Sequence, residues 1–144
     1  MKMIDIVAKD ISSREAVVEG KISLKPSVVR AIRNKKIPKG DVLEAARLAG
    51  ILAAKKTPSL IPLCHPIPLE YVDIRFSIGV KDIKIKAVVK GNAKTGMEME
   101  ALTATAVCAL TIYDMCKPLD KEITISEIKL LRKTGGKSGT YERK

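Results

Sequence analysis

A long apolar segment, from about residue 97 to residue 117, constrains the fold of this chain more than any other feature. Its length and composition predict a helix that is covered on most sides, and Pro118 ends it. A predicted strand, Glu122 to Leu131, comes next, followed by a glycine-rich basic loop over residues 133–139. One helix and one strand that resemble core elements therefore carry carboxylates, lysines and a flexible loop, and this combination indicates an enzyme.

The period of the apolar residues predicts the remaining elements. Alternation predicts three earlier strands, over residues 14–24, 72–78 and 83–89, of which the last two form a hairpin. Pro26 begins a short helix, and Asp41 is a good N-cap for a longer helix from Val42 to about Lys56. The order strand, helices, strand, strand, helix, strand predicts an α+β fold. We expect a ferredoxin-like βαββαβ sandwich, an antiparallel sheet with helices on one face.

The last strand departs from simple alternation. Ile123 and Ile125 are followed by Ile128 and Leu130, so the pattern slips by one residue near Ser126-Glu127. A β-bulge is expected at that point.

At 144 residues the chain is long enough for one domain with a substantial core. We expect a single domain over residues 1–144, with residues 1–13 and 134–144 mobile. No apolar run approaches the roughly 18 residues of a membrane span, and the N-terminus lacks the apolar centre of a secretory signal. The sequence therefore predicts a cytoplasmic protein. The cysteines Cys64, Cys108 and Cys116 form no CxxC pair, so neither structural zinc nor a disulfide framework is expected.

The formal net charge is +11, from 27 lysines and arginines against 16 aspartates and glutamates. A balance this basic favours anionic partners: nucleic acid, an acidic membrane or a phosphorylated small molecule. Solubility alone explains a charged surface equally well, so the net charge does not indicate which of these partners is bound.

Five residues of the long helix fall on one narrow stripe when successive residues are placed 100° apart. They are Glu100, Thr103, Val107, Thr111 and Asp114. The stripe is expected to face solvent or another subunit, because most of the remaining circumference is apolar. Its two carboxylates lie about 21 Å apart along the axis, too far to share one small site within a chain. Two antiparallel copies related by a two-fold axis would bring Glu100 of one towards Asp114 of the other, and we predict such a dimer.

Two interpretations of Asp114 and Lys117 remain open. Residues three apart on a helix surface commonly form an ordinary ion pair. The functional alternative is an acid–base couple, in which a lysine crowded by nearby cations gives up its proton more readily. Thr95 and Glu98 have the spacing of a capping box, which explains Glu98 structurally, whereas Glu100 has no such explanation.

The basic loop after the last strand is not a P-loop, because Leu131 stands where the first glycine is required and no helix follows. Its backbone N–H groups and two lysines can close on phosphate oxygens. A frayed C-terminal tail explains the same residues equally well.

His65 is the single histidine, and it follows Pro62 and precedes Pro66 and Pro68. Three prolines in seven residues forbid a helix or a central strand, so the segment is stiff and extended. A packed histidine is the commoner case, but rigid display suits a ligand-binding group. Lys39 lies just before a predicted helix N-terminus, where N–H groups and a cation together attract phosphate.

Four motifs, in this order, resemble those of the MoaC family, the cyclic pyranopterin monophosphate synthases of molybdenum cofactor biosynthesis. They are Leu60-Ile61-Pro62-Leu63-Cys64-His65-Pro66, Gly96-Met97-Glu98-Met99-Glu100-Ala101-Leu102-Thr103, Ile112-Tyr113-Asp114-Met115-Cys116-Lys117 and Gly135-Gly136-Lys137-Ser138-Gly139. The resemblance covers nearly the whole chain, from Ile4 onward. It implies a ferredoxin-like fold assembled as a homohexamer, a trimer of dimers, with sites shared at the dimer interface.

The resemblance also implies an activity and the residues that perform it. The family is a lyase that converts 3′,8-cyclo-7,8-dihydroguanosine 5′-triphosphate to cyclic pyranopterin monophosphate with release of pyrophosphate. Its catalytic positions fall on Asp114, Lys117 and Lys39. Its substrate-binding positions fall on His65, Glu98, Met99, Glu100, Lys133 and Arg14, of which Arg14 lies in the most weakly matched segment. No metal ligand and no cofactor are implied, except magnesium as a companion of the triphosphate.

A nucleic-acid-binding module is the rival from another class, since a basic ferredoxin-like fold also describes the RNA-recognition motif. That motif stacks bases on aromatic residues of its sheet. The predicted hairpin offers only Tyr71 and Phe76, and no run like the motif's signature is present. We therefore expect no stable nucleic-acid partner and no membrane partner.

Overall fold

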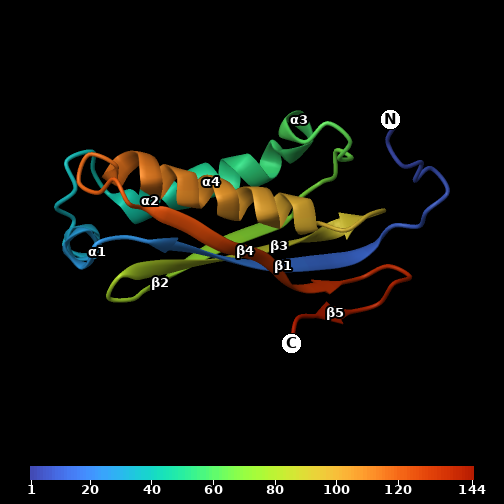
Figure 1. The fold of residues 1–144 in the computed structure, drawn as a ribbon. Helices are drawn as coiled ribbons and strands as arrows, with labels where there is room; N and C mark the ends of the chain where they lie inside the picture. Colours follow the sequence, from blue (N-terminus) through green and yellow to red (C-terminus); the bar gives the residue numbers. More distant parts are fainter.

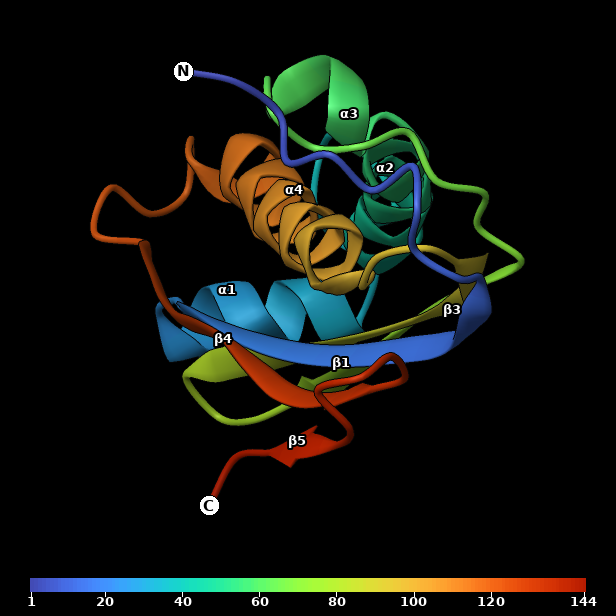
Figure 2. The same ribbon diagram turned by 90° about the vertical axis from the view of Figure 1, so that its right-hand side faces the viewer.

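A computed structural model describes residues 1–144 as one layered α+β unit. The elements follow the order β1 (Ser12–Ser23), α1 (Pro26–Arg33), α2 (Val42–Lys55), α3 (Thr57–Leu60), β2 (Tyr71–Ile78), β3 (Asp82–Ala93), α4 (Glu98–Cys116), β4 (Thr124–Thr134) and β5 (Tyr141–Glu142). Figure 1 shows the helices gathered on one side of a twisted sheet, and Figure 2 shows α2 and α4 side by side above the strands.

The sheet has the strand order β2-β3-β1-β4-β5, and all neighbouring strands are antiparallel. The first four strands reproduce the split βαβ topology, because β1 and β2 are joined through helices but separated in the sheet by β3. The predicted ferredoxin-like fold is therefore confirmed. The short edge strand β5 was not predicted, since two residues leave no periodic pattern to recognise.

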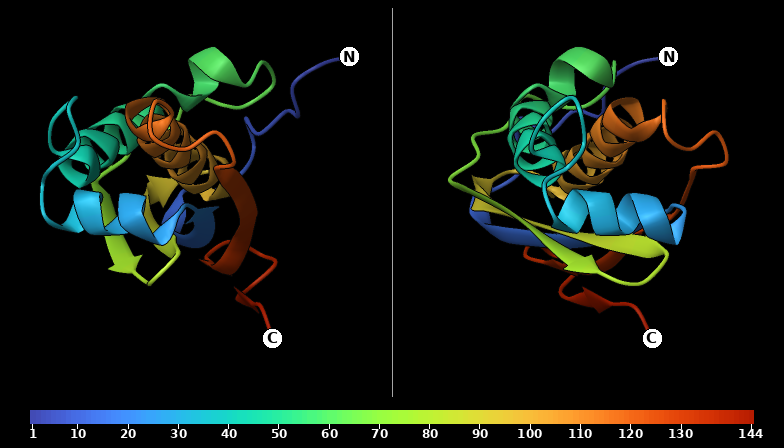
Figure 3. Two further views of the ribbon diagram at one scale, coloured as in Figure 1. Left: turned by 60° about the vertical axis from the view of Figure 1, so that its left-hand side comes forward. Right: turned by 90° about the vertical axis from the view of Figure 1, so that its left-hand side faces the viewer.

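Apolar alternation produces the core, as the sequence predicts. In β1 and β3 every second residue is buried, including Val18, Ile22, Ile83 and Ile85, and these side chains meet the apolar faces of α1, α2 and α4. Views from the other side show α1 lying between the sheet and the end of α4 (Figure 3). The opposite face of the sheet carries no helix.

The helices α2 and α4 approach each other closely because small residues lie between them. At Gly50 there is no room for a Cβ, since it would contact Cys108 Sγ and Ile74 Cδ1 and lie 3.0 Å from the carbonyl oxygen of Ala104. The Cys108 thiol donates to the carbonyl of Ala46 at 3.0 Å, and burial raises its pKa to about 12. This thiol is a packing group rather than a nucleophile.

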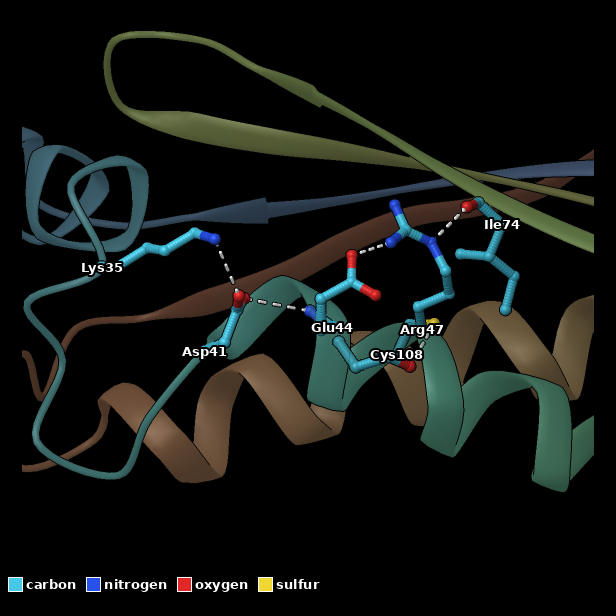
Figure 4. Close-up of polar contacts among 7 residues, drawn as sticks. Lys35, Asp41, Glu44, Arg47, Ile74 and Cys108 are labelled. Carbon is cyan, nitrogen blue, oxygen red and sulfur yellow. Dashed lines mark hydrogen bonds and ion pairs between the residues drawn. The ribbon is translucent and has the colours of Figure 1, made fainter.

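The N-terminal end of α2 is held by polar contacts (Figure 4). Asp41 is the N-cap, as predicted, and its side chain accepts a hydrogen bond from Glu44 N at 3.3 Å. Arg47, paired with Glu44, donates to the carbonyl of Ile74 at 3.0 Å. These bonds attach α2 to β2 and fix the preceding loop, which carries Lys39.

The predicted β-bulge is present. The pairing of β1 with β4 shifts between Glu19 and Lys21, opposite Glu127, whose φ of 53° lies in the left-handed region. A second shift between Val17 and Val18 was not predicted. It leaves Leu131 as the extra residue, and alternation in the sequence gave no sign of it because the flanking residues are a mixture of apolar and basic side chains.

By length and composition alone, α4 could cross a membrane, with a mean hydropathy of 1.2 over 18 residues. Half of that window is buried inside the protein, which is the behaviour of a core helix. Before Leu110 its apolar run is interrupted by Glu98, Glu100, Thr103 and Thr105, and its apolar residues pack against α2 and the sheet.

Candidate active site

The candidate catalytic residues meet at the C-terminal end of α4. Lys39, in the loop before α2, donates from Nζ to Asp114 Oδ2 and to the Asp114 carbonyl, both at 3.0 Å. Lys117 Nζ lies 3.1 Å from the other carboxylate oxygen, Oδ1. All three side chains are largely exposed, and hydrogen bonds from Lys39 and then Lys117 hold the pKa of Asp114 below its usual value.

This arrangement refines the ion pair that the sequence suggested. Asp114 does not pair with Lys117 alone, because Lys39 approaches from a segment 75 residues away in sequence. A simple helix-surface pair would not need the second lysine. We call Lys39, Asp114 and Lys117 the lysine–aspartate cluster.

A separate pocket lies at the N-terminal end of α4, with a volume of about 250 Å³. One wall is the N-terminus of α4, with Glu98, Met99 and Glu100, and another is the segment that carries Cys64 and His65. The N-terminal arm, residues 1–11, closes the third side with Ile4, Ile6 and Lys9. Figure 2 shows the arm running beside the segment that follows α3. We call this cavity the arm pocket.

Glu98 does not form the predicted capping box. The N-cap of α4 is Met97, and no side chain caps the helix. Instead Glu98 Oε1 accepts from Lys133 Nζ at 3.0 Å, while its Oε2 atom is buried with no hydrogen-bond partner. The prediction is wrong because the helix begins three residues after Thr95 and β4 brings a lysine to the carboxylate. This long-range contact is not visible in local spacing.

Glu100 also departs from the prediction for its stripe. It is only 3% exposed, whereas Asp114 at the far end of the same helix is open to solvent. Glu100 lines the arm pocket together with the segment around His65 and the arm. Burial raises the pKa of Glu100 to about 7, and the neighbouring charge of Glu98 acts in the same direction. Glu100 is therefore a buried carboxyl that can hold or release a proton near neutral pH.

Cys64 and His65 face the arm pocket from a segment with no helix or strand, as its prolines predicted. Burial, together with the charges of Glu100 and Glu98, raises the pKa of the Cys64 thiol, which disfavours a nucleophilic thiolate. His65 Nε2 lies 2.6 Å from the carbonyl oxygen of Ile4. A carbonyl can only accept, so Nε2 carries the proton and Nδ1 is the free position.

Arg14 is 5% exposed and lies near the same end of α4. Its Nε and Nη2 donate to the carbonyls of Ala93 and Lys94 at 3.3 and 3.1 Å. The loop glycines Gly135 and Gly136 pack against its side chain, both with positive φ. Arg14 therefore links β1, the end of β3 and the C-terminal loop.

The predicted residues thus form two groups at opposite ends of α4. His65, Glu98, Met99, Glu100, Lys133 and Arg14 lie at or near the N-terminal end, and Lys39, Asp114 and Lys117 lie at the C-terminal end. Figure 1 shows the arm at one end of the helix and the loop that carries Lys39 at the other. Glu100 and Asp114 are about 21 Å apart along the helix axis, so a single chain does not bring both groups to one small molecule.

Sequence reasoning missed the arm. Residues 1–13 show no apolar period, and this pattern does not place Lys9 at a site. Two features of the sequence pointed to the arm: the positive charge of Lys9, and the start of the family resemblance at Ile4. No group of three or more His, Cys, Asp or Glu side chains is placed to hold a metal ion.

The open face of the sheet carries a larger groove, of about 580 Å³. Its acids, Glu15, Asp73 and Glu142, are each paired with a base that also lines it. Of the two hairpin aromatics, only Tyr71 lies there, because Phe76 packs into the core beneath Arg47, 5.3 Å from its ring centroid. One aromatic side chain is a poor platform for stacked bases, so the groove does not resemble an RNA-binding sheet.

A ferredoxin-like sandwich with acid–base groups at one end of a helix and a partly buried pocket at the other defines an enzyme that acts on a small molecule. The chain belongs to the MoaC family, whose sequence model matches residues 3–136.

Named relatives are similar in sequence to this chain over nearly its full length. A protein from Thermoanaerobacter sp. (strain X514) is 54% identical over 144 residues, 99% of this chain and 91% of its own. Proteins from Roseiflexus sp. (strain RS-1) and Brevibacillus brevis are 50% and 51% identical over 142 and 143 residues, covering 97% and 99% of this chain and 90% and 89% of their own. All three are named cyclic pyranopterin monophosphate synthase.

Proposed function

We propose that this protein is a cyclic pyranopterin monophosphate synthase. As a lyase of molybdenum cofactor biosynthesis, it converts 3′,8-cyclo-7,8-dihydroguanosine 5′-triphosphate to cyclic pyranopterin monophosphate and releases pyrophosphate. The name of its relatives supports this activity. The main supporting observation is where the implied residues lie. The catalytic residues form ion pairs at the C-terminal end of α4, and the substrate-binding residues lie at or near the pocket at its N-terminal end.

The lysine–aspartate cluster suits the ring chemistry. Opening the five-membered ring of a purine and building a pterin need several proton transfers, and each needs a donor or acceptor within hydrogen-bond reach. Asp114 holds the Nζ atoms of Lys39 and Lys117 on its two oxygens. Two amines on one carboxylate can donate and recover protons at neighbouring substrate atoms without large movements.

The other end of α4 suits the phosphate chemistry. A sugar hydroxyl oxygen attacks the α-phosphorus, the bond from that phosphorus to the bridging oxygen of the β-phosphate breaks, and pyrophosphate leaves. The hydroxyl proton passes to a base, for which the free Nδ1 of His65 is available. Cations stabilise the charge on the leaving oxygens, and Lys133 and Arg14 lie at this end.

We propose that the two groups meet across a dimer interface, in a homohexamer built as a trimer of dimers. Two antiparallel copies of α4 would place the N-terminal group of one subunit against the C-terminal group of the other. Apolar side chains on the outer faces of α2 and α4 support an interface there: Leu48 is 61% exposed and Leu110 is 57% exposed. Such side chains are favourable on a surface that a second copy covers.

The remaining expectations follow from this function. A biosynthetic enzyme with a small-molecule substrate would work in the cytoplasm, without a stable nucleic-acid or membrane partner. Magnesium would arrive with the triphosphate as part of the substrate, because the phosphate oxygens are its preferred ligands.

The decisive experiment is turnover of the purified protein with the cyclic dihydroguanosine triphosphate. We expect cyclic pyranopterin monophosphate by mass spectrometry and one pyrophosphate for each product molecule. Sedimentation of the same sample tests the shared site. No product from a folded protein would contradict the activity, and full activity in a monomer would contradict the shared site.

A further inference from the structure

Asp120 is a buried carboxylate that neither group of site residues includes. It is 3% exposed, although it lies in the connection between α4 and β4. It is the only buried residue among residues 117–122, and it forms no ion pair. A buried charge without a cation is unfavourable unless hydrogen bonds compensate it, so its hydrogen-bond partners indicate its role.

Both carboxylate oxygens of Asp120 accept backbone hydrogen bonds. Oδ2 accepts from Lys25 N at 2.8 Å, across 95 residues of sequence, and Oδ1 accepts from Glu122 N at 2.9 Å. Lys25 is the N-cap of α1, a helix with no side-chain cap and no acidic residue in its first turn. A negative charge is favourable at a helix N-terminus. Asp120 therefore attaches the end of α4 to the junction of β1 with α1 and to the residues that lead into β4.

The connection that Asp120 anchors also carries Lys117. Lys117 is the C-cap of α4, and residues 117–119 are all exposed. Lys117 N donates to the carbonyl of Tyr113 at 2.8 Å, and Leu119 N donates to the carbonyl of the last helical residue at 2.9 Å. These two bonds connect the turn to α4 alone, so Asp120 supplies its attachment to the rest of the fold.

The lysine–aspartate cluster is built on the last turn of α4. Helix ends fray, because the last carbonyls have no partner within the helix. Asp114 lies in this turn, and its carbonyl and carboxylate both accept from Lys39. Lys117 completes the cluster from the residue directly after the helix. The geometry of the cluster therefore depends on how firmly this end of α4 is held.

We propose that Asp120 is a positioning residue for the lysine–aspartate cluster, which holds Lys117 against Asp114 by fixing the backbone at the end of α4. Asp120 forms no hydrogen bond or ion pair with the three side chains of the cluster, so it acts through Lys117 rather than on the substrate. The inference rests on the proposed function, because it assigns the cluster to proton transfer.

The test uses the full chain with Asp120→Asn, which keeps the shape of the side chain but turns one acceptor into a donor that faces a backbone N–H. Asp120→Ser is the second variant, and it carries the test if the first does not fold. Its hydroxyl can still accept from the N–H two residues on, but the side chain is one bond shorter and does not reach Lys25.

Two controls accompany these variants. Glu122→Gln removes an exposed carboxylate two residues away. Ile85→Val removes one carbon from the core and so lowers stability without touching the connection. Circular dichroism and sedimentation of each variant establish that fold and assembly are unchanged, and activity is measured well below each midpoint of thermal unfolding.

We expect both Asp120 variants to lower kcat about tenfold or more with KM changed less than about threefold, the pattern of misplaced catalytic groups. Both controls should keep the kcat of the unmodified protein. In a Lys117→Ala background, Asp120→Asn should lower kcat by less than about threefold, because its effect passes through the missing side chain. An unchanged kcat in the Asp120 variants would overturn the proposal, as would the full loss in the Lys117→Ala background.

Titration of Asp114 separates this proposal from the proposed function. Hydrogen bonds from Lys39 and then Lys117 lower the pKa of Asp114. Carbon NMR should show a higher pKa of Asp114 in Asp120→Asn than in the unmodified protein, and no change in either control. An unchanged pKa of Asp114 would refute the positioning role even if turnover of the unmodified protein is normal. A raised pKa supports that role even if the unmodified protein forms no cyclic product.

Discussion

Single carboxyl groups behave differently at the two ends of one helix. Asp114 is exposed and holds two lysines, and their hydrogen bonds lower its pKa. Glu100 is buried without a cation beside it, and burial raises its pKa to about 7. Asp114 is therefore a fixed negative charge, while Glu100 changes charge near neutral pH.

Removal of the Lys117 amine should abolish catalysis without disturbing the fold. We expect Lys117→Ala to lower kcat by about 100-fold or more, the usual size of a general acid–base contribution. The side chain is exposed and makes one ion pair, so stability should hardly change. The measurement is steady-state turnover, with Lys121→Ala as the control on a neighbouring exposed lysine. Near-normal turnover would refute the assignment.

Glu100 should make stability fall as pH rises through neutrality. In the unfolded chain the carboxyl ionises near 4.5, but in the folded protein it keeps its proton until about 7. The unfolded state therefore binds fewer protons between these values, and stability present at pH 4 is lost progressively up to pH 7. The full loss is up to about 3 kcal/mol, at 1.36 kcal/mol for each pH unit between the two values.

The Glu100→Gln variant isolates this effect. We expect it to raise the free energy of unfolding above that of the unmodified protein at pH 8, and to leave the two similar at pH 4.5. Denaturant unfolding at several pH values measures the difference. An identical pH dependence in both proteins would show that Glu100 is ionised in the fold. Activity should fall, since the ionisable carboxyl is lost from the pocket.

The elements show how the two ends of α4 are positioned. The helix is fixed by close packing on α2, and α2 is fixed to β2 through Arg47. The loop that carries Lys39 enters α2 through the Asp41 cap, so the lysine–aspartate cluster depends on the same contact between helices. At the other end β4 delivers Lys133 to Glu98.

The α2–α4 contact should not tolerate a methyl group at Gly50. Alanine favours a helix over glycine by about 1 kcal/mol, but here the added Cβ meets Cys108, Ile74 and the backbone of Ala104. We expect Gly50→Ala to destabilise the protein by about 1–3 kcal/mol, as overpacked sites do. Thermal unfolding measures this, with Lys55→Ala on the exposed side of α2 as the control.

A second variant tests the cause. Combining Gly50→Ala with Cys108→Ala removes the nearest side chain and should recover part of the loss. A stabilised Gly50→Ala protein would mean that α4 moves away from α2 at little cost.

At the scale of the whole molecule, a dimer can bring the lysine–aspartate cluster of one subunit to the arm pocket of the other. If each site takes its lysine–aspartate cluster from one subunit and its arm pocket from another, two inactive variants should complement each other. Co-expression of Lys117→Ala with His65→Ala in equal amounts would make half of the dimers mixed, each with one intact site of two. We expect about one quarter of full activity, by the symmetry of a two-fold interface.

The control is co-expression of Lys117→Ala with Lys39→Ala. Both changes lie at the same end of α4, so every site lacks one of the two lysines and no activity should return. Absence of complementation in the first pair, with both variants assembled, would place the whole site within one chain.

Much of the fold was predictable because its signals are local. Alternation in β1 and β3, the Asp41 cap and the bulge near Glu127 depend on neighbours a few residues apart, and the structure confirms each. The ends of the strands were predicted less accurately. β4 runs from Thr124 to Thr134, so it begins two residues and ends three residues later than predicted. The motifs around His65, Glu98 and Asp114 also identified the family from sequence alone, and its sequence model agrees.

By itself, then, the sequence determined the order and type of the elements, the helix length that separates Glu100 from Asp114, and the family. Only the tertiary structure decided what surrounds each charge. Lys39 pairs with Asp114, and Lys133 pairs with Glu98, which was predicted to cap the helix instead. Glu100 is buried, and the arm places Lys9 beside the pocket. The physical reason is that periodicity reports which face of an element is apolar, whereas pKa values and ion pairs depend on groups brought close by folding.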